Sequence, residues 1–123
     1  MATLGKEYAD GELIVRQGES GDCMYVIQEG EVEVVIMRDG QEIPLAVRKS
    51  GEFFGEMAIF ERETRSASVR ARGRARVLTV DRRQLLSRIE EDPALAMRLI
   101  QDMSRRIRHL SAELARLKSD GPG

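Results

Sequence analysis

The pattern of hydrophobic and polar positions changes about two thirds of the way along the chain. Before that point, short apolar runs of strand length alternate with turns, beginning with ELIVRQGE (residues 12–19) and CMYVIQEG (residues 23–30). EVEVVIM (residues 31–37) alternates charged and apolar residues before it becomes fully apolar, which is typical of a half-buried strand. Asp39-Gly40 then predicts a hairpin, because glycine accepts positive φ. In the return strand EIPLAV (residues 42–47), Pro44 favours an edge or a bulge.

Further strand-like runs complete this first part of the chain. A turn at SGEFFGE (residues 50–56) leads into a short strand, and SASVRA (residues 66–71) and ARVLTV (residues 75–80) are two more, with a bend predicted at residues 72–74. Short strands at this spacing predict a sandwich or a barrel.

From Asp81 onward the period is helical. Asp81 predicts an N-cap for a helix over residues 82–91, and Asp92-Pro93 predicts the start of a second, longer helix. The second helix carries a heptad repeat with mostly isoleucine at a and mostly leucine at d, which favours a parallel two-stranded coiled coil. The a and d positions are Ile100, Met103, Ile107, Leu110, Leu114 and Leu117. The alternative is an amphipathic helix packed on its own domain, although such a stripe is usually broader.

Composition limits the classes of function. The length of 123 residues predicts one domain, and 20 basic against 21 acidic residues give no bulk charge that favours nucleic acid or a membrane surface. One cysteine, Cys23, excludes a disulfide framework and a multi-cysteine metal site, which fits a reducing cytoplasm. No apolar run approaches the roughly 20 residues that span a bilayer. RARGRARV (residues 70–77) predicts a solvated outer strand face; the alternative, a weak nucleic-acid patch, lacks aromatic residues to stack bases.

The stretch GEFFGEMAIFERETRSASV (residues 51–69) carries the candidate chemistry. A short helical turn starting at Gly55-Glu56 would present free backbone N–H groups, which favour an anion. Arg65 suits a phosphate because its planar fork makes two charge-assisted hydrogen bonds. Glu56 cannot bind a phosphate but can accept a hydrogen bond from a sugar hydroxyl. The pair therefore indicates a ligand with a phosphate and a ribose, and the alternative is a solvated Glu–Arg salt bridge.

The same stretch resembles the phosphate-binding cassette of cyclic nucleotide-binding domains, with Phe54-Gly55-Glu56 and Arg65-Ser66-Ala67-Ser68 in the family pattern. IVRQGESGDCMYVIQEGEVEV resembles the first half of the family's β-roll, and DPALAMRLIQDMSRRI is similar to the long dimer helix of the bacterial catabolite activator branch. The resemblance implies a mainly β fold with C-terminal helices. The expected parts are a double-stranded β-helix (jelly-roll β-roll) over residues 1–80 with the cassette at 51–69, a short hinge helix and a long dimerisation helix over 81–118, and a disordered tail at 119–123.

The resemblance also implies the roles of individual residues. Arg65 would bind the cyclic phosphate and Glu56 the ribose 2′-hydroxyl, with backbone amides at Gly55 and Ala58 and a phosphate or base contact from Ser66. The other residues of the expected ligand-binding set are Phe54 and Leu45 as apolar wall, Met57, Ala67, Leu110 and Ser111. In the activator branch the base reaches two successive hydroxyl residues of the long helix. Ser111 matches the second, whereas Leu110 replaces the first and weakens any prediction of base selectivity.

The expected function is a cytoplasmic, bacterial regulatory domain that binds cyclic AMP, with cyclic GMP as the alternative, and that forms a homodimer through the long helix. No helix-turn-helix follows that helix, so the chain is either a fragment of a transcription regulator or a stand-alone sensor. An enzyme is not expected: metal-dependent cupins need several histidines, and His109 is the single one here. A metal-free isomerase would need a paired acid and base, which the sequence lacks. An interaction module that has lost its ligand is the remaining alternative, and the intact Glu56 and Arg65 argue against it.

Overall fold

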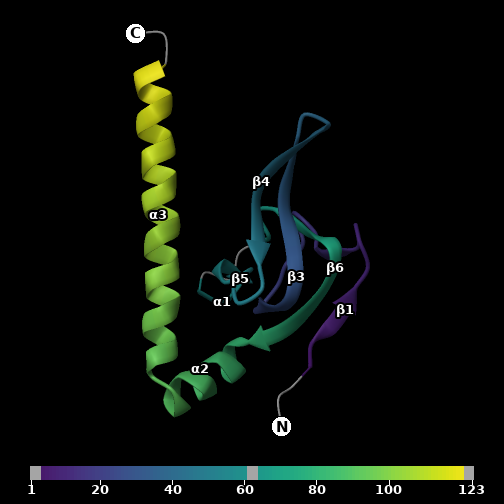
Figure 1. Cartoon of the computed structure of the whole chain (residues 1–123), viewed down its shortest axis with the longest axis vertical. Helices are drawn as coiled ribbons and strands as arrows, with labels where there is room; N and C mark the ends of the chain where they lie inside the picture. The colour runs from purple at the N-terminus through teal and green to yellow at the C-terminus, as the bar shows by residue number, and fades with distance from the viewer. Residues whose placement is uncertain (1–3, 61–63, 121–123) are drawn as a thin grey trace. The chain divides into compact units, whose positions relative to one another are not determined.

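The computed structural model describes residues 4–60 and 64–120, and its contacts divide the chain into two compact units, residues 1–84 and 85–123. The first unit is built around a six-stranded antiparallel sheet in the order β1-β6-β3-β4, in which β2 also pairs with β6 and β5 with β3 (Figure 1). The strands are β1 (Lys6–Tyr8), β2 (Leu13–Val15), β3 (Cys23–Arg38), β4 (Gln41–Lys49), β5 (Phe53–Phe54) and β6 (Ser68–Asp81). The expectation of a mainly β fold, a β-roll followed by C-terminal helices, is confirmed.

The two longest strands run through glycines at which the sequence pattern predicted interruptions. β3 continues through Gly30 (φ 79°) and β6 through Gly73 (φ 73°), and the register between the two strands shifts between Ile27 and Glu29 and again between Glu29 and Glu31. A Cβ atom on Gly30 would lie 2.2 Å from the carbonyl oxygen of Arg74, so only glycine fits there. The predicted strand end at residue 30 and the predicted bend at residues 72–74 were therefore wrong. These glycines form a bulge inside one long strand pair, because the neighbouring strand continues to hydrogen-bond on both sides.

The β3–β4 hairpin follows the sequence prediction. Asp39 and Gly40 at its tip have φ values of 54° and 77°, as a two-residue hairpin turn requires. β4 is an edge strand, and its register against β3 shifts between Pro44 and Ala46, so that Leu45 is the extra residue of a bulge. The predicted edge or bulge at Pro44 is thus confirmed. The short β1 was not predicted, and the strand expected over residues 12–19 is reduced to β2.

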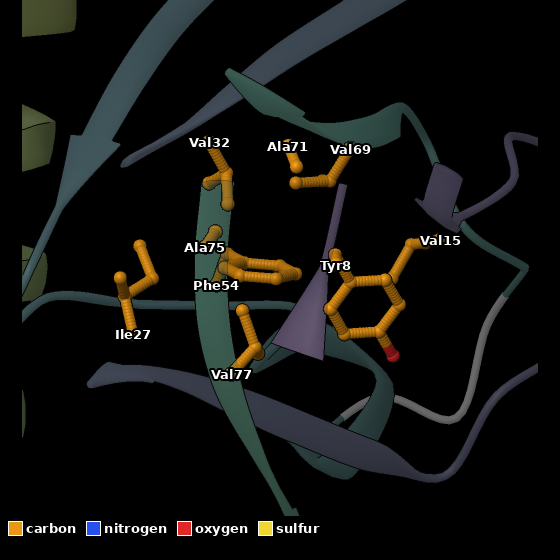
Figure 2. Close-up of a cluster of buried hydrophobic side chains, with 9 residues drawn as sticks. All are labelled: Tyr8, Val15, Ile27, Val32, Phe54, Val69, Ala71, Ala75 and Val77. Carbon is orange, nitrogen blue, oxygen red and sulfur yellow. The ribbon is translucent and has the colours of Figure 1, made fainter. Parts of the chain in front are cut away.

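The core lies on one face of the long strands. Alternate residues of β3 and β6 point to the same side, where they meet residues from β1, β2 and β5 (Figure 2). The members of this cluster are Tyr8, Val15, Ile27, Val32, Phe54, Val69, Ala71, Ala75 and Val77.

The arginines of residues 70–77 alternate with these core residues and each pairs with a glutamate. Arg70 donates to Glu42 at 2.8 Å, and the other contacts are Arg72 with Glu31, Arg74 with Glu7, and Arg76 with Glu7 and Glu29. Each positive charge is thus matched by a carboxylate from another strand of the sheet, which supports the solvated outer face and not a nucleic-acid patch.

The helices begin where the sequence predicted. In α2 (Arg82–Glu91), Asp81 Oδ1 accepts from the Gln84 backbone N at 2.7 Å and Gln84 Oε1 accepts from the Asp81 backbone N at 2.9 Å, a reciprocal capping box. At the start of α3 (Ala94–Asp120), Asp92 Oδ1 accepts from the Ala94 backbone N at 3.2 Å. Both predicted caps are confirmed. A disordered tail was predicted over residues 119–123. α3 extends to Asp120, and residues 121–123 lie outside the described residues.

α3 carries the predicted heptad stripe on an exposed face. Five of its six a and d residues are 59–64% exposed, and Met103 is half-buried. The five are Ile100, Ile107, Leu110, Leu114 and Leu117. Within residues 4–60 and 64–120, no helix is long and apolar enough to cross a membrane.

Candidate functional site

The site begins at the turn between β5 and the one-turn helix α1 (Met57–Phe60). β5 is fixed against β3 by the pairs Tyr25–Phe54 and Val26–Phe53. Gly55 then adopts φ 78°, and the Ala58 backbone N donates to the Gly55 carbonyl oxygen at 3.2 Å, which starts the helix. Ala58 and Ile59 are buried and hold α1 on the β-roll, whereas Met57 is exposed. The predicted single helical turn after Gly55-Glu56 is confirmed.

The backbone of Arg65 is fixed to a different turn. Its N–H donates to the carbonyl oxygen of Glu19 at 2.8 Å, and its carbonyl oxygen accepts from the N–H of Gly18 at 2.8 Å. Ser20 and Thr64 form an isolated antiparallel bridge beside these bonds. Residues 61–63 of the cassette lie outside the described residues. Arg65 thus starts from a backbone position that the turn between β2 and β3 determines.

The side chain of Arg65 joins this turn to the start of β3 and to the turn at Gly55. Its Nη1 donates to the Gly55 carbonyl oxygen at 2.9 Å, and its Nη2 donates to the Cys23 carbonyl oxygen at 2.9 Å. The guanidinium carbon lies 5.6 Å from the centre of the Tyr25 ring, within the range of a cation–π contact. The two carbonyl oxygens and the aromatic ring partly compensate the cost of burying the positive charge of Arg65, and they fix the orientation of its guanidinium.

Tyr25 supports this arrangement from β3. Its ring stacks on Phe54 with centroids 5.0 Å apart and an interplanar angle of 12°. Burial, together with a hydrogen bond between the Cys23 thiol and the Tyr25 hydroxyl at 3.6 Å, raises the pKa of Tyr25 to about 12. Tyr25 is therefore neutral at physiological pH. No sequence signal identified Tyr25 as part of the site, because its position depends on the register between β3 and β5.

Glu56 and Arg65 have a property that no other charged or polar residue shares within the part of the chain that the structure describes. They are the two buried ones, with 8% and 9% of their surface exposed. Charged side chains are almost never buried unless they are paired or bind something. The sequence-based alternative, a solvated salt bridge between two surface residues, does not fit this burial.

Comparison with known proteins identifies the family. The model of the cyclic nucleotide-binding domain matches residues 5–92, which include the whole β-roll and both turns of the site. The chain belongs to the cyclic nucleotide-binding domain family. No group of three or more His, Cys, Asp or Glu residues that could hold a metal ion occurs among the residues of this domain that the structure describes.

Relatives of this cyclic nucleotide-binding domain occur in proteins with different outputs. A putative potassium channel protein of Rhodopseudomonas palustris is 38% identical over 111 residues, which are 88% of this chain and 26% of the channel protein. The cAMP-activated global transcriptional regulator CRP of Salmonella typhimurium is 32% identical over 113 residues, 90% of this chain and 54% of that protein. The crystal structure of Thermus thermophilus catabolite activator protein superposes with a TM-score of 0.82 at 33% identity, covering 92% of this chain and 54% of that one. The domain thus spans about half or less of the length of these proteins.

The structure brings most of the expected ligand-binding residues to the two turns of the domain. Ser66 is exposed and Ala67 half-buried directly after Arg65, and their backbone N–H groups have no hydrogen-bond partner among the described residues. Phe54 is buried in the core under Tyr25, whereas Leu45 is exposed in the bulge of β4. Leu110 and Ser111 are exposed residues of α3, in the second unit, and their part in a site stays a prediction.

Proposed function

We propose that this domain is a regulatory sensor of a purine cyclic monophosphate, with cyclic AMP as its ligand, and that it has no catalytic activity of its own. The observation that carries the proposal is the burial of one cationic and one acidic residue of the cassette, Arg65 and Glu56. Cyclic AMP is favoured over cyclic GMP because the transcriptional regulator of Salmonella typhimurium, matched over 90% of this chain, is described as cAMP-activated.

The chemistry of the two turns suits such a ligand. Arg65 still has N–H groups beyond the two that bond to carbonyl oxygens. The backbone N–H groups of Ser66 and Ala67, which have no hydrogen-bond partner among the described residues, follow it directly. Together these donors would bind the cyclic phosphate. Glu56 carries a negative charge and would repel that phosphate, so it binds the ligand by accepting a hydrogen bond from the ribose 2′-hydroxyl. The base would extend toward Leu110 and Ser111 of α3.

The dimer belongs to the same proposal. The exposed heptad stripe of α3 would pair with the same stripe of a second copy, which removes five large apolar side chains from water. In the heptad Glu113 falls at g and Lys118 at the following e, so the two could form a salt bridge between the helices of the two copies. Glu113 bonds to Arg116 of its own helix at 3.0 Å, and the salt bridge would have to replace or share that contact. Ligand binding would shift α3 only to the extent that the ligand binds the two arrangements differently. The output would be a further domain of a longer cytoplasmic bacterial regulator.

A calorimetric titration tests the ligand. Cyclic AMP, cyclic GMP, 2′-deoxy cyclic AMP and 5′-AMP are titrated into the full chain. Cyclic AMP is expected to bind most tightly, 2′-deoxy cyclic AMP more weakly because Glu56 loses its donor, and 5′-AMP weakest because its phosphate is not cyclic. If neither cyclic nucleotide produces heat or raises the melting temperature at millimolar concentration, the chain is instead an interaction module that keeps the fold without a ligand.

A further inference from the structure

Gly21 lies directly against the guanidinium of Arg65. A Cβ atom on Gly21 would lie 2.4 Å from Nη2, 2.5 Å from Nε and 2.7 Å from Cζ of Arg65. Because both nitrogens would be closer than the carbon, that Cβ would stand beside the Nη2–Nε edge and not over the face of the group. All three distances are well below van der Waals contact.

The backbone does not explain this glycine. Gly21 does not have a positive φ, so an alanine can adopt its backbone conformation without strain. Gly55 differs, because it has φ 78° and its Cβ would also lie 2.8 Å from Nη1 of Arg65. Gly21 is therefore required for the space it leaves beside Arg65, and replacing it tests that space alone.

The edge that Gly21 leaves open is the one that matters for a phosphate. Two adjacent nitrogens of an arginine can bind two oxygens of one phosphate side by side. The side-chain hydrogen bonds of Arg65 use Nη1 for the Gly55 carbonyl oxygen and Nη2 for the Cys23 carbonyl oxygen, with a longer contact of 3.8 Å from Nη2 to Cys23 Sγ. Within residues 4–60 and 64–120 no acceptor is bonded to Nε. The N–H of Nε lies on the edge of the guanidinium that is next to Gly21.

We propose that Gly21 is a positioning residue of the ligand site: the space beside it keeps the Nη2–Nε edge of Arg65 open to the phosphate of the ligand. This inference rests on the proposed function, because it assigns the edge to the phosphate of a cyclic nucleotide. The guanidinium cannot yield cheaply to a side chain at position 21, because the two carbonyl bonds and the Tyr25 ring hold it in place.

The test is Gly21→Ala, measured by titration with cyclic AMP and by thermal unfolding. Loss of one hydrogen bond to a charged donor predicts an affinity about 10- to 100-fold weaker. Gly40→Ala is the matched control: Gly40 has φ 77° with nothing within 4 Å of its Cβ position, so alanine there lowers stability without touching the site. In an Arg65→Lys background, Gly21→Ala should cost less than threefold, since the compact ammonium of lysine has no planar edge to block.

A second measurement needs no ligand. In nitrogen-15 NMR spectra of the ligand-free chain, the Arg65 Nε–H signal is identified by its loss in Arg65→Lys. That signal should shift in Gly21→Ala and stay in place in Gly40→Ala. A wild-type chain that binds neither cyclic nucleotide overturns the proposed function and this inference with it. If the wild type binds cyclic AMP and Gly21→Ala binds it with the same affinity, this inference alone is overturned. The same holds if the Arg65 Nε–H signal of Gly21→Ala does not differ from that of the wild type.

Discussion

Replacing Arg65 by alanine should lower both the stability of the ligand-free chain and its affinity for a cyclic nucleotide. In the structure the guanidinium makes two charge-assisted hydrogen bonds, each 2.9 Å long, and Arg65 is 9% exposed. The Gly55 carbonyl oxygen keeps its bond from the Ala58 N–H, whereas the Cys23 carbonyl oxygen loses a charged donor. We therefore expect a loss of about 1–3 kcal/mol in the free energy of unfolding. At about 4 °C per kcal/mol, the melting temperature should fall by about 4–12 °C.

The affinity should change by a larger factor. Removing one partner of a buried charged contact costs about 2–5 kcal/mol, and tenfold in affinity corresponds to about 1.4 kcal/mol. Arg65→Ala should thus bind cyclic AMP about 30-fold to several thousand-fold more weakly. Arg65→Lys keeps the charge but not the fork, so it should recover much of this loss and remain about tenfold weaker than the wild type.

Calorimetric titration gives the affinity, and urea denaturation with thermal unfolding gives the stability of the three proteins without nucleotide. A folded Arg65→Ala chain with wild-type affinity would remove Arg65 from the site. An unchanged melting temperature in that variant, with the affinity lost, would refute the argument that the two carbonyl oxygens hold the guanidinium before the ligand arrives. The two results are independent, because one compares bound with free chain and the other compares folded with unfolded chain.

Four further predictions concern other parts of the chain. Glu56→Gln should bind cyclic AMP about tenfold more weakly and 2′-deoxy cyclic AMP as the wild type does, since the amide oxygen can accept only part of the lost interaction; titration with both ligands checks this. Ile107→Lys should give a monomer by light scattering, and a dimer that survives would place the interface outside α3. Asp81→Ala should lower the free energy of unfolding by about 1 kcal/mol in urea denaturation, because the capping box at α2 is lost. Burial raises the pKa of Tyr25 from 10.0 to about 12, so as the pH rises Tyr25 loses its hydroxyl proton in the unfolded chain before it does so in the folded chain. The free energy of unfolding should therefore fall between about pH 10 and 12. Urea denaturation of Tyr25→Phe across this range should show a shallower fall.

The elements that the sequence predicted correctly have signals confined to a few neighbouring residues. Asp81 and Asp92 cap helices through residues two or three positions away, and Asp39-Gly40 forms its turn within the hairpin itself. The misinterpreted glycines, Gly30 and Gly73, have the same positive φ that a turn requires. A turn and a bulge are alike at the glycine and differ in whether the partner strand continues on both sides. That information lies in another part of the chain, so the local pattern could not supply it.

The residues of the candidate site divide in the same way, into those with a local sequence signal and those whose place depends on another part of the chain. Glu56 and Arg65 were singled out because the chemistry of a carboxylate and a guanidinium beside a helix start depends on residue type, and their burial is consistent with that choice, whereas their part in binding a ligand stays a prediction. Gly21 and Tyr25 were missed because what places them beside Arg65 is the fold and not their residue type. The Tyr25 ring lies beside Arg65 because the register of β3 and β5 places it opposite Phe54, and Gly21 matters because a Cβ there would meet a side chain from the far end of the cassette. A binding constant that depends on Gly21 would therefore show that the orientation of the arginine, and not its presence alone, determines how tightly this domain holds a phosphate.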